Sequence, residues 1–285
     1  MDRTRGAPLS DVTSDTEELA ERYDRISNAQ YTLGLHLVER MDVKEGEVIL
    51  DIGCGTGRLA LSVSNSVGPS GKVVGVDPSP HRIEVASRKL SDGTSSNLQF
   101  SIGAAEDLGQ FPNASFDGVY LSSVLHWVRD KDRALEEAHR VLRPGGRIGI
   151  TMPAPGSMAI LRAAIVRVAS RPPYASHVDR TVRNSKIDAE KLGSLLVQAG
   201  FCKPSVEVRE KKRLHPSAED LMEFYDASSF GNFLRFMPPD LRECLKADVV
   251  QELEGGRAAE GIELISRTII ATAKKPPQDQ NGAPP

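Results

Sequence analysis

From residue 46 onward, short apolar runs alternate with longer segments whose apolar residues recur at helical spacing. The short runs predict five strands, at 47–52, at 72–77 and over "LQFSIG", "FDGVYLSS" and "RIGITM". Helical patterns lie between them, for example over 131–142, where the breaker residues "RPGG" are expected to end the helix. Strands separated by helices cannot pair as hairpins. The pattern therefore predicts an α/β fold, a doubly wound and mostly parallel sheet with helices on both faces.

Helical patterns also flank this core. Two helices are expected before residue 46, and the C-terminal part predicts a helix ended by Gly200 and an antiparallel edge pair of strands. A helical insertion at 217–254 lies between these two strands and opens on a capping-box pattern. We therefore expect a polar tail, a core with N-terminal helices, the C-terminal half of the sheet with a helical lid, and a second polar tail. Their bounds are 1–14, 15–153, 154–274 and 275–285.

Composition and charge exclude several classes of protein. The 285 residues are 39% hydrophobic and 26% charged, as in ordinary globular proteins, and the net charge is −3. Nucleic-acid binding usually needs a basic face, so no nucleic-acid partner is expected. No apolar run approaches the ~18 residues of a membrane span and no export signal is present, so we expect a cytoplasmic protein without a membrane partner. Three widely spaced cysteines indicate free thiols, and no Cys/His spacing suits a metal.

The stretch "VILDIGCGTG" at 48–57 is the first candidate for chemistry, because alternate glycines let a ligand approach the backbone closely. A P-loop requires lysine after its last glycine, but Arg58 stands there. A dinucleotide loop has the form G-x-G-x-x-G, which this stretch lacks. Asp51, two residues before the first glycine, suits an ammonium group on the ligand better than a pyrophosphate.

Asp77 narrows the class of expected ligands further. It ends the second predicted strand about 20 residues past the glycine loop, at the spacing where an acidic side chain accepts hydrogen bonds from a ribose. The expected ligand thus has a ribose and an amine but no diphosphate. S-adenosylmethionine (SAM) meets all three conditions.

Four ordered motifs, "VILDIGCGTG", "VVGVDPSP", "GAAEDL" and "FDGVYLSSVLHWVRDKDRALEEAHRVLRPGGRI", together resemble the class I SAM-dependent methyltransferases. The resemblance covers about residues 45–152, with a looser similarity over the C-terminal strands. It implies a Rossmann-like sheet of seven strands with the last one antiparallel, SAM as the cofactor and a small-molecule acceptor. The cofactor-binding residues that it implies are Tyr23, Asp51, Gly53, Cys54, Gly55, Asp77, Pro78, Ala105, Glu106 and Ser122.

The family's roles carry over residue by residue. The resemblance assigns Asp51 to the amino group of SAM, directly or through water, and Asp77 to the ribose hydroxyls. Pro78 lies beside the adenine, and Ser122 offers its carbonyl to the amine. Many relatives have an aspartate where this chain has Ala104, so adenine recognition is expected to depend more on backbone groups and on Glu106.

The acceptor is indicated by "SSVLHWV", which is similar to a segment of small-molecule carboxyl methyltransferases of the trans-aconitate and juvenile hormone acid type. That similarity implies acceptor contacts from Gln30 and Trp127, with helix packing and core packing as the alternatives. His126 is the candidate catalytic base for a hydroxyl acceptor, or else a structural histidine. In the lid, Phe230 belongs to an aromatic cluster that forms either an apolar wall over the acceptor or the lid's own packing, and Arg235 is the candidate contact for an acidic substrate.

The expected function is methyl transfer from SAM to a carboxylate or hydroxyl oxygen of a small molecule, by a monomer or homodimer. Two alternatives stay open. One is carbon methylation of a quinone-like or natural-product substrate, and the other is a SAM-binding protein of this fold without methyl transfer.

Overall fold

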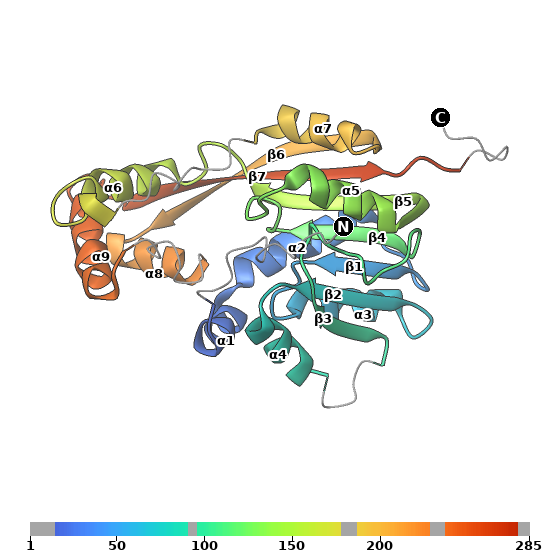
Figure 1. The fold of residues 1–285 in the computed structure, drawn as a ribbon. Helices are drawn as coiled ribbons and strands as arrows, with labels where there is room; N and C mark the ends of the chain where they lie inside the picture. The colour runs from blue at the N-terminus through green and yellow to red at the C-terminus, as the bar shows by residue number, and fades with distance from the viewer. Residues whose placement is uncertain (1–14, 91–95, 178–186, 229–236, 279–285) are drawn as a thin grey trace, which may run out of the picture. The chain divides into compact units, whose positions relative to one another are not determined.

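The computed structural model describes residues 15–90, 96–177, 187–228 and 237–278 (Figure 1). The strands are β1 (Val48–Ile52), β2 (Lys72–Asp77), β3 (Leu98–Ile102), β4 (Phe116–Ser122), β5 (Leu142–Pro153), β6 (Cys202–His215) and β7 (Ile262–Lys274). The helices are α1 (Glu17–Ile26), α2 (Asn28–Met41), α3 (Arg58–Val67), α4 (Pro80–Arg88), α5 (Lys131–Val141), α6 (Ala159–Ala169), α7 (Ala189–Gln198), α8 (Ala218–Ser228) and α9 (Pro239–Glu254), with a 3₁₀ turn at Ala175–His177.

The strands form one sheet in the order β3-β2-β1-β4-β5-β7-β6. Strands β1 to β5 pair in parallel, as the alternation of strands and helices predicts. Strand β7 is antiparallel to β5, because Lys275 donates to the carbonyl of Gly146 whereas Arg267 accepts from the N–H of Ala154. The predicted α/β, doubly wound, mostly parallel sheet is therefore confirmed. Parallel pairing brings the carboxyl ends of β1 to β4 to the same edge.

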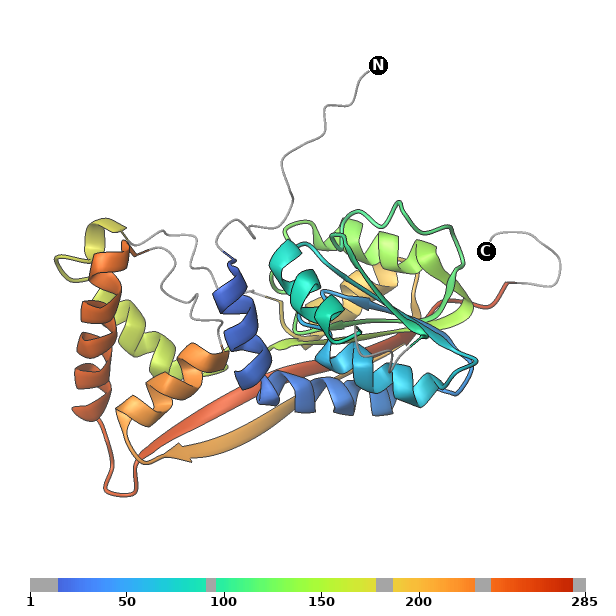
Figure 2. The ribbon, with the colours of Figure 1, turned by 90° about the horizontal axis from the view of Figure 1, so that it is seen from below.

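Contacts divide the chain into two compact units. Of the described residues, the first holds 15–90, 96–152, 189–207 and 269–278, and the second holds 153–177, 187–188, 208–228 and 237–268. In the first unit, α2 and α3 cover one face of the sheet and α5 the other (Figure 2). The boundaries expected at 15–153 and 154–274 stay predictions. The tail expected at 1–14, and that at 275–285 from residue 279 on, lie outside the described residues.

The second unit is mainly helical. Apolar residues of α6, α8, α9 and the start of β7 share its core, among them Leu161, Leu221, Leu245 and Leu264. Ser217 Oγ accepts the N–H of Asp220 at 3.2 Å, so the helix start expected there is confirmed. Phe230 and Arg235, the acceptor residues expected in the lid, lie outside the described residues. None of the helices described is long and apolar enough to cross a bilayer.

One predicted strand begins too late. The residues "RPGG" were expected to end the fifth helix, which does end just before them, but they lie inside β5, which was expected to begin only at Arg147. The helix ends at Val141, and Leu142 is already extended because it pairs with Phe116 at the start of β4. The pairing register then shifts before Gly118, and this irregularity accommodates the proline.

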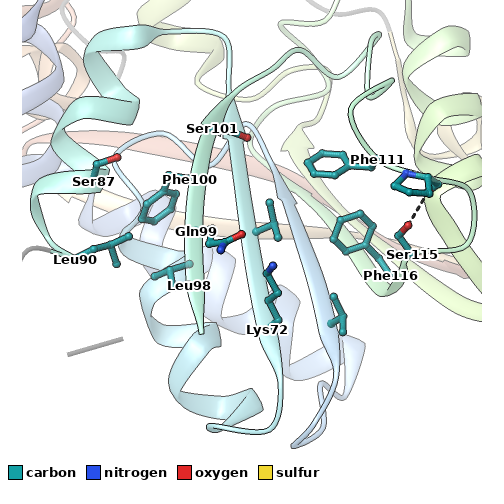
Figure 3. Close-up of a pocket in the computed structure, with 13 residues that line it drawn as sticks. Lys72, Ser87, Leu90, Leu98, Gln99, Phe100, Ser101, Phe111, Ser115 and Phe116 are labelled. Atoms are coloured by element: carbon teal, nitrogen blue, oxygen red, sulfur yellow. Dashed lines mark hydrogen bonds between the residues drawn. The ribbon is translucent and has the colours of Figure 1, made fainter. Parts of the chain in front are cut away.

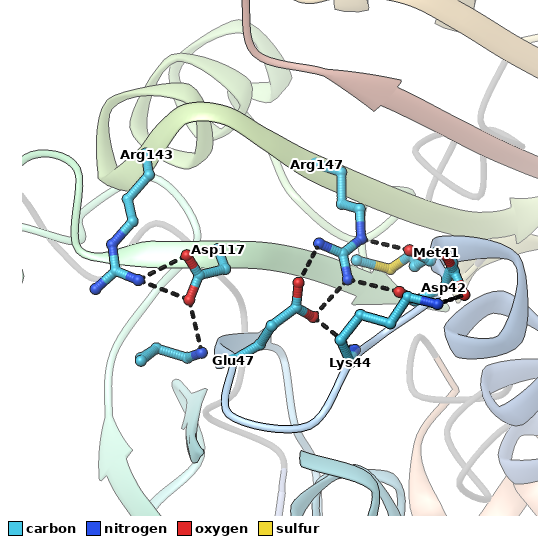
Figure 4. A network of polar contacts seen from close by, with 8 residues as sticks. Met41, Asp42, Lys44, Glu47, Asp117, Arg143 and Arg147 are labelled. Atoms are coloured by element: carbon cyan, nitrogen blue, oxygen red, sulfur yellow. Dashed lines mark hydrogen bonds and ion pairs between the residues drawn. The ribbon is translucent and has the colours of Figure 1, made fainter. Parts of the chain in front are cut away.

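Ion pairs fix the amino-terminal end of the sheet (Figure 4). Asp117 accepts the first backbone N–H of β1 at 2.8 Å and pairs with Arg143 Nη1 at 2.6 Å. Arg147 pairs with Glu47 and also donates to two carbonyls at the end of α2. Because Glu47 directly precedes β1 and Asp117 is the second residue of β4, these contacts anchor α2 and the sheet at the end away from the predicted site.

Candidate active site

The glycine loop after β1 has a left-handed backbone at each of its glycines. The φ angles are 73° at Gly53, 55° at Gly55 and 76° at Gly57, values that other residues adopt only with strain. Space is also restricted. A Cβ added at Gly53 would lie 2.3 Å from Val124 Cγ2. One added at Gly57 would lie 2.4 Å from Phe100 Cζ. Glycine is therefore needed at the first and last of these positions for two independent reasons.

Gly57→Ala is expected to lower the free energy of unfolding by roughly 2–5 kcal/mol, because left-handed strain adds to overpacking against Phe100. Gly145→Ala is the matched control. Gly145 has a φ of 80°, but no atom lies within 4 Å of its added Cβ, so only the strain applies. Urea unfolding measures both variants, and Phe100→Leu should restore stability only to Gly57→Ala. Equal losses in the two single variants would contradict this reading.

Asp77 ends β2 beside the loop and is 5% exposed. Its Oδ2 accepts the N–H of Gly55 and its Oδ1 accepts the N–H of Ser79, each at 2.9 Å. Burial raises the pKa of Asp77, while Arg82 and the two backbone donors oppose the rise. Since each carboxylate oxygen accepts more than one hydrogen bond, the group retains capacity for two hydroxyls. This arrangement suits the expected contact with a ribose.

Asp51 lies on the neighbouring strand and is 2% exposed. The Tyr120 hydroxyl donates to its Oδ2 at 2.8 Å. Burial raises the pKa of Asp51 to about 8, the hydrogen bond from Tyr120 opposes the rise, and Asp77 adds to it. A carboxyl group held so far from its ordinary range would be strongly favoured as the anion by a bound cation.

Cys54 fills the loop between these two carboxyl groups. Its N–H and that of Gly53 donate to the carbonyl of Val76, at 3.0 and 2.7 Å. Burial raises the pKa of the Cys54 thiol well above its ordinary value, and Asp51 and Asp77 add to the effect. Because the thiolate is the reactive form, this rise in pKa and the burial of Cys54 favour a small side chain that fits the loop over a reactive thiol.

The segment after β3 is fixed to the segment after β4. Ala105 and Glu106 are buried, and Glu106 Oε1 accepts the N–H of Arg129 at 3.2 Å. From α5, Glu137 accepts the N–H of Leu108 at 3.0 Å. Glu106, expected at the adenine edge, thus also ties two loops together, a contact that the sequence did not indicate.

The segment after β4 turns sharply onto the glycine loop. Ser122 ends the strand half-buried, and Ser123 has a φ of 62°. The N–H of Ser123 donates to both the carbonyl and the Oγ1 of Thr151, each at 3.0 Å. This turn brings Val124 against Gly53, so the first and fourth loops are in direct contact.

His126 and Trp127 follow in a turn closed by a hydrogen bond from Trp127 N–H to the carbonyl of Val124, at 2.8 Å. Their ring centroids are 5.0 Å apart. Trp127 is 50% exposed, so its ring does not fill a core. Trp127 therefore presents a broad aromatic face, with the half-buried imidazole of His126 beside it.

The N-terminal helices reach the same edge. Tyr23 of α1 approaches the loop, since a Cβ at Gly55 would lie 3.3 Å from Tyr23 Cε1. Gln30 is half-buried in the first turn of α2. Gly34, on the same face one turn later, packs against the end of β4, because a Cβ there would lie 3.1 Å from Ser122 Oγ. The face of α2 that carries Gln30 thus meets the fourth loop.

Charged side chains that the sequence did not single out hold these helices in place. Thr56 Oγ1 donates to Asp24 at 2.7 Å, and Lys89 Nζ pairs with Asp24 and donates to the carbonyl of Thr56. Arg58 donates to Asn28 at 2.8 Å. Residues of the glycine loop and of α3 and α4 thereby bind α1 and the start of α2.

A separate surface pocket of about 540 Å³ lies over α4, β2, β3 and the segment 111–116 (Figure 3). Its lining includes Phe100, Phe111 and Phe116, but no residue expected to bind the cofactor or acceptor. In the part of the chain that the structure describes, no group of three or more His, Cys, Asp or Glu side chains could hold a metal ion.

The residues at the carboxyl edge fit SAM. The glycine loop has no side chain at positions 53, 55 and 57, Asp77 offers acceptors for a ribose, and Asp51 offers a buried partner for a cation. The glycine loop has neither the lysine of a P-loop nor the glycine spacing of a dinucleotide loop, so it lacks the groups that hold a diphosphate.

The fold and these loops define a Rossmann-like protein that binds a nucleoside with a positively charged substituent. Residues 50–150 match the family model described as a methyltransferase domain. The chain is 34% identical to the ubiquinone/menaquinone biosynthesis C-methyltransferase UbiE of Hahella chejuensis, over 68% of this chain and 84% of that protein. It is 33% identical to a demethylmenaquinone methyltransferase of Lactobacillus johnsonii, over 53% of this chain and 64% of that protein. The crystal structure of the YcgJ protein of Bacillus subtilis shares the fold, with a TM-score of 0.60 and 18% identity, over 86% of this chain and 97% of that one.

The chain belongs to the class I SAM-dependent methyltransferases. It is a methyltransferase, its cofactor is SAM and its acceptor is a small molecule, so these three predictions are confirmed. The comparisons do not support the expected similarity to carboxyl O-methyltransferases in particular, because the two relatives above are quinone methyltransferases by name. The roles of the individual residues and the oligomeric state stay predictions.

Proposed function

We propose that the protein transfers the methyl group of SAM to a ring carbon of a quinol-like aromatic acceptor. The observation that carries this proposal is the 34% identity to a quinone C-methyltransferase over most of that protein's length. The half-exposed ring of Trp127 beside His126 supports it, because an aromatic acceptor can stack on such a face. We therefore propose methylation on carbon in place of the methylation on oxygen that was expected from the sequence.

In this proposal Asp77 accepts from the ribose hydroxyls, Asp51 faces the amino group, and Ser122 offers its carbonyl to that group. Pro78, Ala105 and Glu106 border the adenine, and Tyr23 covers the cofactor. When bound, SAM supplies a methyl group activated by its positive sulfur. The residues of this chain then need mainly to orient the acceptor in line with that methyl group and to exclude water.

A quinol acceptor also requires proton transfer. Its ring carbon becomes nucleophilic when a hydroxyl on the ring loses a proton, and the methylated carbon must later lose its own proton to restore aromaticity. His126 is the histidine that follows β4, and histidine is the commonest general base in enzymes. We assign His126 as the base, with Gln30 and Trp127 holding the acceptor.

His126→Gln is expected to lower kcat by roughly a hundredfold and to remove the low-pH limb of its pH profile, on which activity rises as the base loses its proton, because general-base catalysis contributes factors of this size. His36→Gln on α2 is the matched control and should leave the profile unchanged. A carboxylate acceptor arrives already ionised, so an unchanged profile in His126→Gln would instead favour the carboxylate as acceptor.

The proposal is tested by incubating the protein with methyl-labelled SAM and a panel of reduced demethylmenaquinone, phenols and carboxylic acids. Mass spectrometry then locates the methyl group. We expect ring-carbon methylation of the quinol. Product methylated on oxygen would replace the proposal with the carboxylate or hydroxyl reading. Binding of SAM without any labelled product from the panel or from a cell extract would favour a binding protein without transfer.

A further inference from the structure

One register position crosses five strands of the sheet below the glycine loop. Phe100 on β3 pairs with Gly75 on β2, which pairs with Asp51 on β1. Asp51 pairs with Tyr120 on β4, which pairs with Gly149 on β5. The two glycines make room for large neighbours. A Cβ at Gly75 would lie 2.6 Å from Phe100 Cδ1, and one at Gly149 would lie 2.3 Å from the sulfur of Met41. Asp51 is the acidic member of this row.

Tyr120 occupies this row without any exposed surface. The apolar pattern of β4 predicts a core position there, and phenylalanine would fill the same volume. A buried hydroxyl is costly unless it has a hydrogen-bond partner. Here that partner is the Asp51 carboxyl, at 2.8 Å through Oδ2. The Tyr120 hydroxyl therefore donates its hydrogen bond to one oxygen of the Asp51 carboxyl, a group to which the proposed site assigns a role.

We propose that Tyr120 is a positioning residue for the cofactor: its hydroxyl orients the Asp51 carboxyl and stabilises it as the anion that the cofactor's ammonium group requires. This inference rests on the proposed function, in which Asp51 faces the amino group. Tyr120 itself touches no part of the cofactor in this scheme, because it acts only through Asp51.

The groups around Asp51 determine in which direction the pKa of its carboxyl shifts. Burial raises its pKa to about 8, the Tyr120 hydrogen bond lowers it, and Asp77 raises it. The buried Cys54 thiol also faces this group. At neutral pH the free protein therefore holds Asp51 largely protonated, and the proton must leave when an ammonium group binds. Cofactor affinity should rise with pH and level off near the pKa of Asp51. Loss of the Tyr120 hydroxyl should raise the pH at which cofactor affinity levels off.

Tyr120→Phe tests the inference with two ligands, titrated by calorimetry over about pH 6 to 9. S-adenosylhomocysteine carries the ammonium group, whereas 5′-methylthioadenosine keeps the adenine, ribose and sulfur without it. At neutral pH we expect about tenfold weaker binding of S-adenosylhomocysteine, the size of one hydrogen bond to a charged group. Methylthioadenosine should bind as to the wild type. The pH at which S-adenosylhomocysteine affinity levels off should rise.

Two further variants separate positioning from structure. Tyr174→Phe removes a matched hydroxyl, which donates to Asp248 at 2.6 Å in the second unit, and should change neither affinity. In an Asp51→Asn background, Tyr120→Phe should add no further loss, because its partner is already neutral. Equal weakening of both ligands by Tyr120→Phe, or an unchanged pH profile, overturns the inference. If the wild type binds methylthioadenosine and S-adenosylhomocysteine equally well at every pH, the Asp51 role in the proposed function fails instead.

Discussion

Asp77→Ala is expected to weaken SAM binding at least tenfold, which corresponds to about 1.4 kcal/mol or more. Two contributions add. The variant loses the acceptor assigned to both ribose hydroxyls, and hydrogen bonds to a charged group contribute roughly 1.5–3 kcal/mol each. It also frees the N–H groups of Gly55 and Ser79, so the glycine loop loses its side-chain bond to β2 and keeps only the bonds of Gly53 and Cys54 to the carbonyl of Val76. Calorimetric titration with S-adenosylhomocysteine measures the change.

Asp117→Ala is the matched control for this experiment. Asp117 also accepts a backbone N–H from a neighbouring strand, at 2.8 Å, but it stands at the amino end of β4. Its loss should lower the free energy of unfolding and leave SAM affinity nearly unchanged. Unchanged affinity in Asp77→Ala would remove Asp77 from the cofactor site.

Trp127→Ala is expected to lower kcat/KM for the methyl acceptor by roughly tenfold or more, while SAM affinity stays within about twofold. The reason is the division of roles between the loops. Asp77 and the glycine loop hold the cofactor, whereas the exposed ring of Trp127 is assigned to the acceptor. Steady-state kinetics with the acceptor found by the product screen, together with SAM titration, separates the two effects. Trp127→Phe should retain part of the activity.

Val197→Ala on α7 is the matched control, because Val197 is a large apolar side chain with 56% exposure, close to the 50% of Trp127. It should alter neither constant. Full activity in Trp127→Ala would mean that its ring is not part of the acceptor site. Equal loss of SAM affinity and turnover would assign Trp127 to the cofactor instead.

The sequence predicted the parallel core because each of its strands carries its own signal. A run such as "KVVGVD" is apolar, β-branched and short, and β2 covers the same six residues. The carboxyl ends of parallel strands meet at one edge, so Asp51 on β1, Asp77 at the end of β2 and the segment after β4 that carries Trp127 come to the same edge of the sheet. The family motifs then identified the cofactor, which the comparisons confirm.

The contacts between those loops were not predictable from the sequence. Tyr120 has the apolar alternation of a core residue, and only its strand pairing with Asp51 gives its hydroxyl a purpose. Glu106 was assigned to adenine from its motif, but its bond to the N–H of Arg129 depends on how two loops fold onto each other. The early start of β5, with "RPGG" inside the strand, was missed for a similar reason, since strand pairing outweighed the local preference of proline and glycine.

Phe100 packs against Gly57 at the start of α3 and against Gly75 inside β2, because an added Cβ at either would lie 2.4 or 2.6 Å from its ring. The three positions therefore behave as one steric unit. In proteins of this family they should vary together, so that a side chain larger than hydrogen at 75 accompanies a residue smaller than phenylalanine at 100. Substitutions that exchange side-chain volume among these three positions would change the packing beneath the glycine loop without altering any residue assigned to the cofactor itself.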